Sequence, residues 1–397
     1  LVSEKTLDNY ADILINFALN SGKGVRKGEV VYLQVPECAK PFLISLRKAV
    51  LKAGAHPLTQ FLPDGLEREF YELANTEQIS FFPEKYLKGL VDIADHRVII
   101  EAETGKHELE GIDPKKIMLR EKVFKPYKEW RDEKENRGKL TWVIALYGRE
   151  AMAKEAGLSL KEYWNQIIKS CYLDLRDPIK KWKKSFEEVN RIKNKLNSMY
   201  IKKLHIKSKN TDLTIGIDKN TRWLDGAGSN IPSFEVFISP DWRLTKGHVY
   251  FNQPLYRYGN LMKDIHLEFK NGKVIKAKAR KGENILKEMI AVKNADKIGE
   301  FSLTDVRLSR IDKFMGHTLF DENFGGKYGN THIALGNAYK DSYPGDPSKV
   351  SKKKWKEWGY NESAIHTDII STENRIVTAY LENGKKLVIY KNGKFAI

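Results

Sequence analysis

The sequence has few cysteines and prolines and no long hydrophobic run. Its 397 residues include 2 Cys and 13 Pro. Because Cys38 and Cys171 are far apart and have no further thiol beside them, they cannot form a disulfide framework or a four-thiolate zinc site. We expect two ordinary buried thiols in a reducing, cytoplasmic compartment. No apolar stretch reaches the roughly 18 residues of a membrane-spanning helix, so a membrane partner is not expected.

The motifs of several large enzyme classes are missing as well. Residues 35–38, which follow the first expected strand, are not glycine-rich, and this excludes a dinucleotide-binding fingerprint at that place. No P-loop, G-x-S-x-G elbow or H-E-x-x-H zinc motif occurs. The 41% of hydrophobic residues are enough for a packed core in a chain this long, so a disordered protein is also excluded.

Positive charge is in excess, with a net charge of +17. The densest lysine clusters, residues 180–184 and 352–356, each contain a tryptophan, Trp182 and Trp355. These tryptophans could stack on nucleic-acid bases. We favour a second interpretation, in which each cluster is the solvated face of a helix with one buried Trp. A basic nucleic-acid-binding protein stays an alternative, although no helix-turn-helix, RRM or zinc-finger pattern supports it.

The first half of the chain alternates between strand and helix patterns. We expect strands over residues 29–35, 56–62, 97–102 and 140–147, and helices over 7–19, 39–53 and 115–132. The spacing suits parallel strands joined by right-handed crossovers. Ser159 and Glu162 form a capping box that begins a further helix, and Pro178 begins a long helix that reaches about residue 200. The sequence therefore predicts an α/β N-terminal domain over residues 1–200.

The second half is richer in short strands. Strands are expected over residues 204–207, 213–218, 236–239, 265–269 and 274–279, with one helix over 283–293. Asn-Gly dipeptides at 271–272, 383–384 and 392–393 are strong signals for hairpins. We therefore predict an α+β C-terminal domain over residues 201–397 with mostly antiparallel pairing.

Candidate metal ligands gather in this second half. On a strand, His366 and Asp368 would point to one face and could hold one cation or a pair of cations. The pair alone is weak evidence, because the sequence has a second pair of the same kind, His266 and Glu268.

Other candidate residues stand in apolar surroundings. Glu235 and Glu300 each lie in an apolar strand pattern, where an acid is costly unless it is paired or bound to a cation. The alternative for each is a surface carboxylate or a helix cap. Glu322 precedes His332 by ten residues, and the glycine-rich segment between them could bring the two together. Tyr339 follows His332 by seven residues, on the same face if that segment is helical.

Five segments of this region carry a family resemblance. NIPSFEVF, IGEF, LFDEN, HIALGNAY and HTD occur in this order. As a set they resemble the M29 family of metalloaminopeptidases. Residues 10–36, which end in YLQVP, look like the N-terminal domain of that family. The resemblance covers residues 6–395, most of the chain.

The resemblance implies a two-domain homodimer with two divalent ions, zinc or cobalt, and peptide substrates that have a free N-terminus. Carried over by motif, the implied metal ligands are Glu235, Glu300, Glu322, His332, His366 and Asp368. The implied catalytic residues are Glu300, Tyr339 and Glu235. Phe234 stands where relatives often carry an acidic or small residue, so the general base stays open. Residues 324–330 lengthen the loop before His332, which affects the geometry at Glu322.

The expected function is that of a metal-dependent aminopeptidase. Two close metal ions can activate a water and polarise a carbonyl at once, and four carboxylates with two imidazoles suit that task. The alternatives are the nucleic-acid-binding protein described above and a non-catalytic relative of the peptidase fold.

Overall fold

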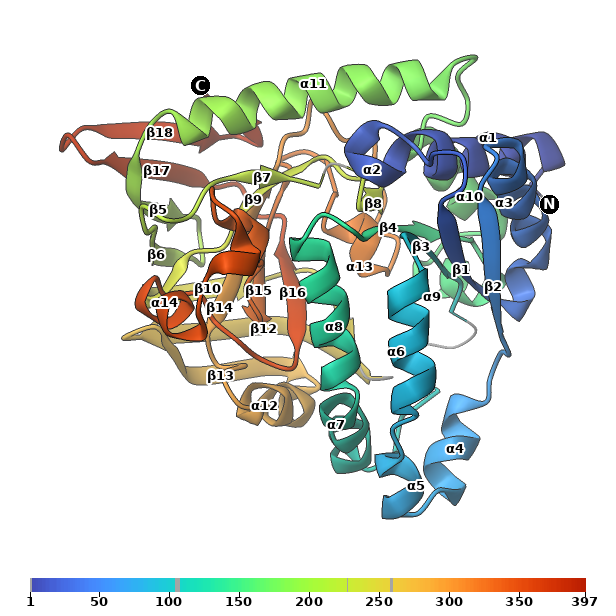
Figure 1. Cartoon of the computed structure of the whole chain (residues 1–397). Helices are drawn as coiled ribbons and strands as arrows, with labels where there is room; N and C mark the ends of the chain where they lie inside the picture. The colour runs from blue at the N-terminus through green and yellow to red at the C-terminus, as the bar shows by residue number, and fades with distance from the viewer. Residues whose placement is uncertain (1, 104–107, 227, 258–259) are drawn as a thin grey trace. The chain divides into compact units, whose positions relative to one another are not determined.

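The computed structural model describes residues 2–103, 108–226, 228–257 and 260–397, which form two compact units (Figure 1). Unit 1 comprises Leu1–Phe186, Gly226–Ser233 and Lys313–Phe320, and unit 2 comprises Glu187–Asp225, Phe234–Asp312 and Asp321–Ile397. The chain passes from unit 1 to unit 2 within α11 (Pro178–Asn197), the long helix that Pro178 begins. The domain limits given above, 1–200 and 201–397, stay a prediction. Among the described residues, none of the helices combines the length and the apolar character that crossing a membrane requires.

Unit 1 is built on a parallel sheet of five strands in the order β2-β1-β3-β4-β8. The strands are β1 (Val30–Pro36), β2 (His56–Leu62), β3 (His96–Glu101), β4 (Thr141–Leu146) and β8 (Asn230–Ile231). The strands predicted in the first half thus lie within one residue of their observed ends. The α/β class and the parallel pairing are confirmed.

Helices connect these strands. They are α1 (Glu4–Ile13), α2 (Leu19–Gly22), α3 (Lys40–Lys52), α4 (Glu67–Leu73), α5 (Thr76–Ser80), α6 (Glu84–Ile93), α7 (Pro114–Val123), α8 (Lys125–Asn136), α9 (Glu150–Glu155) and α10 (Leu160–Ser170). The capping box forms as predicted, because Ser159 Oγ accepts from the Glu162 backbone N–H at 3.3 Å. On one side of the sheet, Tyr10 of α1 and Phe42 of α3 stack with ring centroids 4.9 Å apart.

Both cysteines are free thiols. Cys171 is buried, and burial raises its pKa to about 12. Cys38 is only half-buried, so the expectation of two buried thiols is wrong for this residue. The reason is its position just beyond β1, where the chain leaves the sheet. Burial still raises the pKa of Cys38 to about 11, so both thiols stay protonated near neutral pH.

The tryptophans of the lysine clusters are buried. Trp182 is 0% exposed and its Nε1 donates to Cys171 O at 3.1 Å. Trp355, in α14 (Lys352–Glu357), is 5% exposed and packs edge-on against Tyr360. Neither ring is accessible to a nucleic-acid base, so the lysines around them form solvated helix faces.

Unit 2 contains two antiparallel sheets. The larger has nine strands in the order β11-β12-β10-β6-β5-β17-β18-β19, with β13 beside β12. These strands are β5 (Ile201–Lys207), β6 (Asp212–Gly216), β10 (Asp241–Phe251), β11 (Leu255–Arg257), β12 (Asn260–Lys270), β13 (Lys273–Lys281), β17 (Ile376–Leu381), β18 (Lys386–Lys391) and β19 (Lys394–Phe395). Hairpins form at all three Asn-Gly dipeptides.

The smaller sheet has five strands in the order β16-β15-β14-β9-β7. They are β7 (Leu224–Asp225), β9 (Glu235–Ile238), β14 (Ile298–Thr304), β15 (Asn330–Gly336) and β16 (His366–Ser371). With α12 (Glu283–Ala291) this makes the second half α+β, as predicted. Every residue of β9, β14 and β15 is buried.

Candidate metal centre

Four neighbouring strands of the smaller sheet of unit 2 carry most of the candidate ligands. Glu235 begins β9, Glu300 lies in β14, His332 in β15, and His366 begins β16. The strands are adjacent in the order β16-β15-β14-β9, so these side chains come together although they are distant in sequence. Because the strands are buried, charged side chains here must find partners.

A register shift in the β14–β15 pairing lies beside Glu300. The shift falls between Ile298 and Glu300, and it sets Glu300 opposite Ala334. Gly299 occupies the irregular position, where a Cβ atom would lie 2.2 Å from Asn337 O. Bulges of this kind often redirect a side chain at a functional site. Only glycine allows the backbones to approach this closely.

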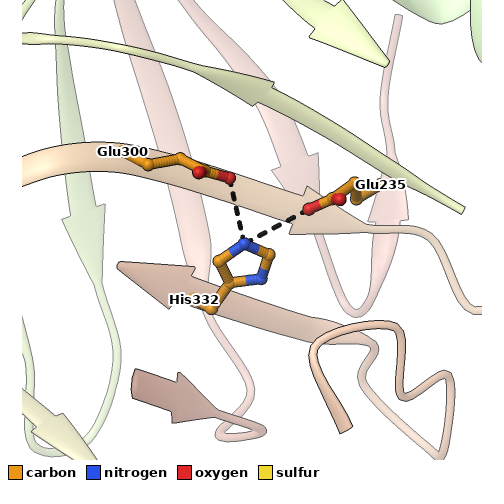
Figure 2. A group of neighbouring side chains, drawn as sticks. All are labelled: Glu235, Glu300 and His332. Atoms are coloured by element: carbon orange, nitrogen blue, oxygen red, sulfur yellow. Dashed lines mark hydrogen bonds and ion pairs between the residues drawn. The ribbon is translucent and has the colours of Figure 1, made fainter. Parts of the chain in front are cut away.

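Glu300 lies between the two imidazoles. Its Oε1 is 3.1 Å from His332 Nε2, and its Oε2 is 3.3 Å from His366 Nε2. Figure 2 shows the carboxylates of Glu300 and Glu235 converging on the His332 ring, with Glu235 Oε2 3.2 Å from His332 Nε2. Asp368 Oδ1 is 3.4 Å from His366 Nε2.

Glu322 reaches the cluster from outside the sheet. It follows α13 (Thr318–Asp321), and one of its oxygens lies within 4.8 Å of ligand atoms of His332 and Asp368. The next residue, Asn323, accepts a hydrogen bond from the backbone N–H of Phe234 at 2.6 Å, which ties this loop to the start of β9. The structure thus brings all six predicted residues together in three overlapping groups, Glu235–Glu300–His332, Glu300–His366–Asp368 and Glu322–His332–Asp368.

Tyr339 also lies beside the cluster, although the segment before it is not helical. Residues 330–336 form β15, a strand, and Tyr339 follows after the chain has left the sheet. Its backbone N–H donates to Ser239 Oγ at 2.9 Å. Its ring packs on His366 with centroids 4.8 Å apart. A buried strand is apolar on both faces, so its sequence pattern resembles that of a buried helix.

Burial and crowding shift the pKa values of the acids in opposite directions. Burial raises the pKa of Glu235, and burial together with the charges of Glu235 and Asp368 raises the pKa of Glu322 well above its usual range. Burial also acts to raise the pKa of Asp368, but the neighbouring His366 outweighs it and lowers that pKa to about 2.

The imidazoles and the phenol respond to the same acids. Burial opposes a charge on His332, yet hydrogen bonds to Glu235 and Glu300 raise its pKa well above the usual range. Asp368 and Glu300 likewise overcome burial and raise the pKa of His366 to about 10. Burial and the nearby carboxylates raise the pKa of Tyr339 well above its usual value, so this phenol keeps its proton. The cluster therefore favours positive charge at its centre.

The donor set fits divalent cations. Carboxylate oxygens and imidazole nitrogens are the usual ligands of zinc and related metals. His366 Nδ1 is 2.7 Å from Asn337 O and donates its proton to this carbonyl, so that Nε2, once a cation takes the place of its proton, faces the acids as a ligand. Asp368 Oδ1 is buried and accepts no hydrogen bond. A cation between these groups would satisfy both.

Ser302 is a residue of this site that the sequence did not reveal. It is 0% exposed, and its Oγ donates to Glu235 Oε2 at 2.9 Å. The available signal was its position two residues after Glu300, which places both on one face of a strand. By contrast, the second His-x-acid pair, His266 and Glu268, is exposed on β12, and His266 stacks on Tyr250 instead.

Comparisons with known proteins agree with this geometry. The sequence model of the family described as Thermophilic metalloprotease (M29) matches residues 3–395. Aminopeptidase PepS of Streptococcus thermophilus is 27% identical, with 99% of this chain and 98% of that protein covered. Aminopeptidase AmpS of Bacillus subtilis is 28% identical, with 98% of each covered.

A solved structure shares the fold. Wild-type AmpT from Thermus thermophilus has a TM-score of 0.85 and 23% identity, over 99% of this chain and 100% of that one. The predicted resemblance is confirmed by the match to the family over nearly the whole sequence. The chain therefore belongs to the M29 family of thermophilic metalloproteases, and it is an enzyme of the hydrolase class.

Proposed function

We propose that this hydrolase is an aminopeptidase that uses two divalent metal ions, zinc or cobalt. The observation that carries the proposal is the position of Glu300, whose two oxygens face different imidazoles. Glu300 also belongs to two of the three ligand groups, one with Glu235 and His332 and one with His366 and Asp368. A carboxylate shared in this way is what a pair of adjacent cation positions requires.

The residues of the two groups that share Glu300 have distinct parts in the proposed site. Glu235 and His332 hold the first cation position, His366 and Asp368 hold the second, and Glu300 is common to both. When bound, two such ions supply an activated water and polarise the scissile carbonyl. Tyr339, which keeps its proton, can donate a hydrogen bond to the negative charge that develops on the substrate oxygen.

The substrate class follows from the relatives and from the charge of the site. The similar proteins are named aminopeptidases, PepS, AmpS and aminopeptidase T. A free α-amine is a cation, and the acids of the cluster offer it a partner. We therefore propose peptides with a free N-terminus as substrates. We also propose that the enzyme acts in the cytoplasm, because its two cysteines are free thiols, and that it is a homodimer, as the family resemblance implies.

Removing the metal should test the proposed function directly. Dialysis against a chelator is expected to abolish hydrolysis of a free tripeptide, because the activated water and the polarised carbonyl are then lost. Adding back zinc or cobalt should restore the rate. The measurement is the rate of amino-acid release, paired with metal content by elemental analysis. Full activity in a metal-free sample would contradict the proposal.

Replacing Ser302 tests whether its hydrogen bond to Glu235 contributes to metal affinity. Ser302→Ala removes the hydrogen bond that orients Glu235, and metal affinity should fall about 10- to 100-fold, as is typical for such outer partners. A competing metal indicator measures the affinity. Ser185→Ala is the matched control, because Ser185 is also buried and contacts the Tyr172 hydroxyl at 3.0 Å. Equal losses of metal affinity in both variants would mean that Ser302 has no specific role.

A further inference from the structure

The two faces of the unit 1 sheet differ in chemistry. On β1, Val31, Leu33 and Val35 are 0% exposed and form the apolar face. Tyr32 and Gln34 alternate with them and point to the other face. A sheet in a doubly wound domain is covered by helices on both sides, and its strands are usually apolar on both faces. The polar face is therefore unusual.

Arginine lies in the middle of this polar face. The strand register sets Arg97 of β3 between Tyr32 of β1 and Trp142 of β4. Arg97 is 9% exposed, so its guanidinium is almost removed from water. One of its terminal nitrogens, Nη2, donates to Gln34 Oε1, while its Nε has no hydrogen-bond partner. Gln34 in turn donates to Gln60 Oε1 at 3.0 Å, which fixes its carbonyl towards Arg97.

Helix α8 contributes a second arginine to the same layer. Right-handed crossovers place α6 and α8 on the face opposite to α3, and Figure 1 shows the two helices side by side. Tyr127, Arg131 and Glu135 recur every four residues and so share one side of α8. Glu135 Oε1 accepts from Trp142 Nε1 at 2.8 Å, which fastens this side of the helix to β4. None of the residues of α8 is buried, although the helix covers this face of the sheet.

The positive charge of the two guanidinium groups is only partly compensated by acids. The Nε of Arg131 is buried without a hydrogen-bond partner, and its guanidinium lies 4.6 Å from the centroid of the Tyr127 ring. Burial, reinforced by the charge of Arg131, lowers the pKa of Arg97 to about 10. The charge of Glu135 acts on Arg97 in the opposite sense to Arg131, but it does not outweigh burial. Buried positive charge that is not fully compensated is costly.

We propose that this layer is a binding site for a small oxyanion, a carboxylate or phosphate group held between Arg97 and Arg131. A guanidinium is a planar fork of donors that matches the oxygens of either group. The unpartnered Nε atoms provide donors from both the sheet and the helix. The bound anion joins α8 to β3 and neutralises the positive charge that Glu135 compensates only in part. The site lies within unit 1 and is separate from the metal cluster of unit 2.

Calorimetric titration of the full-length, metal-loaded protein tests this site. Inorganic phosphate and acetate are titrated separately at constant ionic strength, and at least one should bind saturably. Arg131→Gln is expected to weaken that binding about tenfold to a hundredfold, because one charged hydrogen-bonding group is lost. Arg97→Lys should weaken it as well, since lysine keeps the charge but not the fork. Tighter phosphate binding identifies a phosphoryl ligand, and tighter acetate binding identifies a carboxylate.

Arg137→Gln is the matched control. It makes the same change of residue and charge at the end of the same helix, but Arg137 is exposed and pairs with Glu133. All these variants keep the metal cluster, so oxyanion binding at the metals is unchanged among them. Unchanged affinity in Arg131→Gln, an equal loss in Arg137→Gln, or no saturable binding of either anion overturns the proposal. If Arg97→Lys does not fold, the anion affinity of Arg131→Gln alone decides, because Arg131 is only half-buried.

Discussion

Glu300→Gln is expected to lower kcat by at least about a thousandfold, equivalent to roughly 4 kcal/mol of transition-state stabilisation. The reason is geometric, because each oxygen of Glu300 faces a different imidazole. An amide offers one neutral oxygen and an NH2 group that only donates, so it can serve only one of the two cation positions. Metal binding should weaken together with turnover. The fold should persist, since the amide has the same shape.

The measurement combines steady-state kinetics, metal content and a thermal melt of the same protein sample. Glu268→Gln is the matched control, because Glu268 belongs to the exposed His-x-acid pair on β12 outside the cluster. That variant should retain normal activity and metal content. Near-wild-type activity in Glu300→Gln would remove Glu300 from the mechanism, whereas loss of folding would leave metal affinity in Ser302→Ala as the test of the site.

Local structure around the site could be predicted because its signals are local. The Asn-Gly dipeptide at 271–272 gives the β12–β13 hairpin by turn geometry alone. The spacing of His366 and Asp368 predicts one face of a strand, and both side chains lie in β16 with 3.4 Å between His366 Nε2 and Asp368 Oδ1. These inferences need only the period of a strand.

The assembly of the site could not be predicted from such patterns, because it depends on pairing between distant segments. The register shift beside Glu300 determines where its side chain points, and no local signal specifies it. The approach of Glu322 depends on the bond between Asn323 and the backbone of Phe234, 89 residues away in sequence. The prediction that these residues share one site came from the resemblance to the family motifs and not from a physical argument.

The arginine layer of unit 1 was missed for a different reason. In β1 the pattern of Tyr32 and Gln34 between valines and leucine is that of a strand with one solvated face. The polar face is instead covered by α8, a helix without buried residues. The alternation of polar and apolar residues shows which side chains share a face of the strand. It does not show whether water or other polar side chains cover that face. The sequence pattern therefore did not predict that Arg97 is buried.

Acetylating the N-terminus of a tripeptide should lower kcat/KM by roughly 30-fold to several thousand-fold. Acetylation removes the positive charge and the lone pair of the α-amine, so neither a carboxylate of the cluster nor a metal can hold it. Losing a charged partner in a desolvated pocket typically costs about 2–5 kcal/mol, which gives this range. Release of the first residue from the free and acetylated peptides is compared at equal concentration with metal supplied.

Amidation of the C-terminus of the same tripeptide is the control for this experiment. It removes a charge of similar size from the far end of the substrate, where an aminopeptidase does not anchor its substrate. The amidated peptide should therefore be cleaved at nearly the rate of the free one. Equal rates for the free and acetylated peptides would point to an endopeptidase. A loss with the amidated peptide alone would mean that the carboxylate is the group recognised, because the carboxylate is the only group that amidation changes.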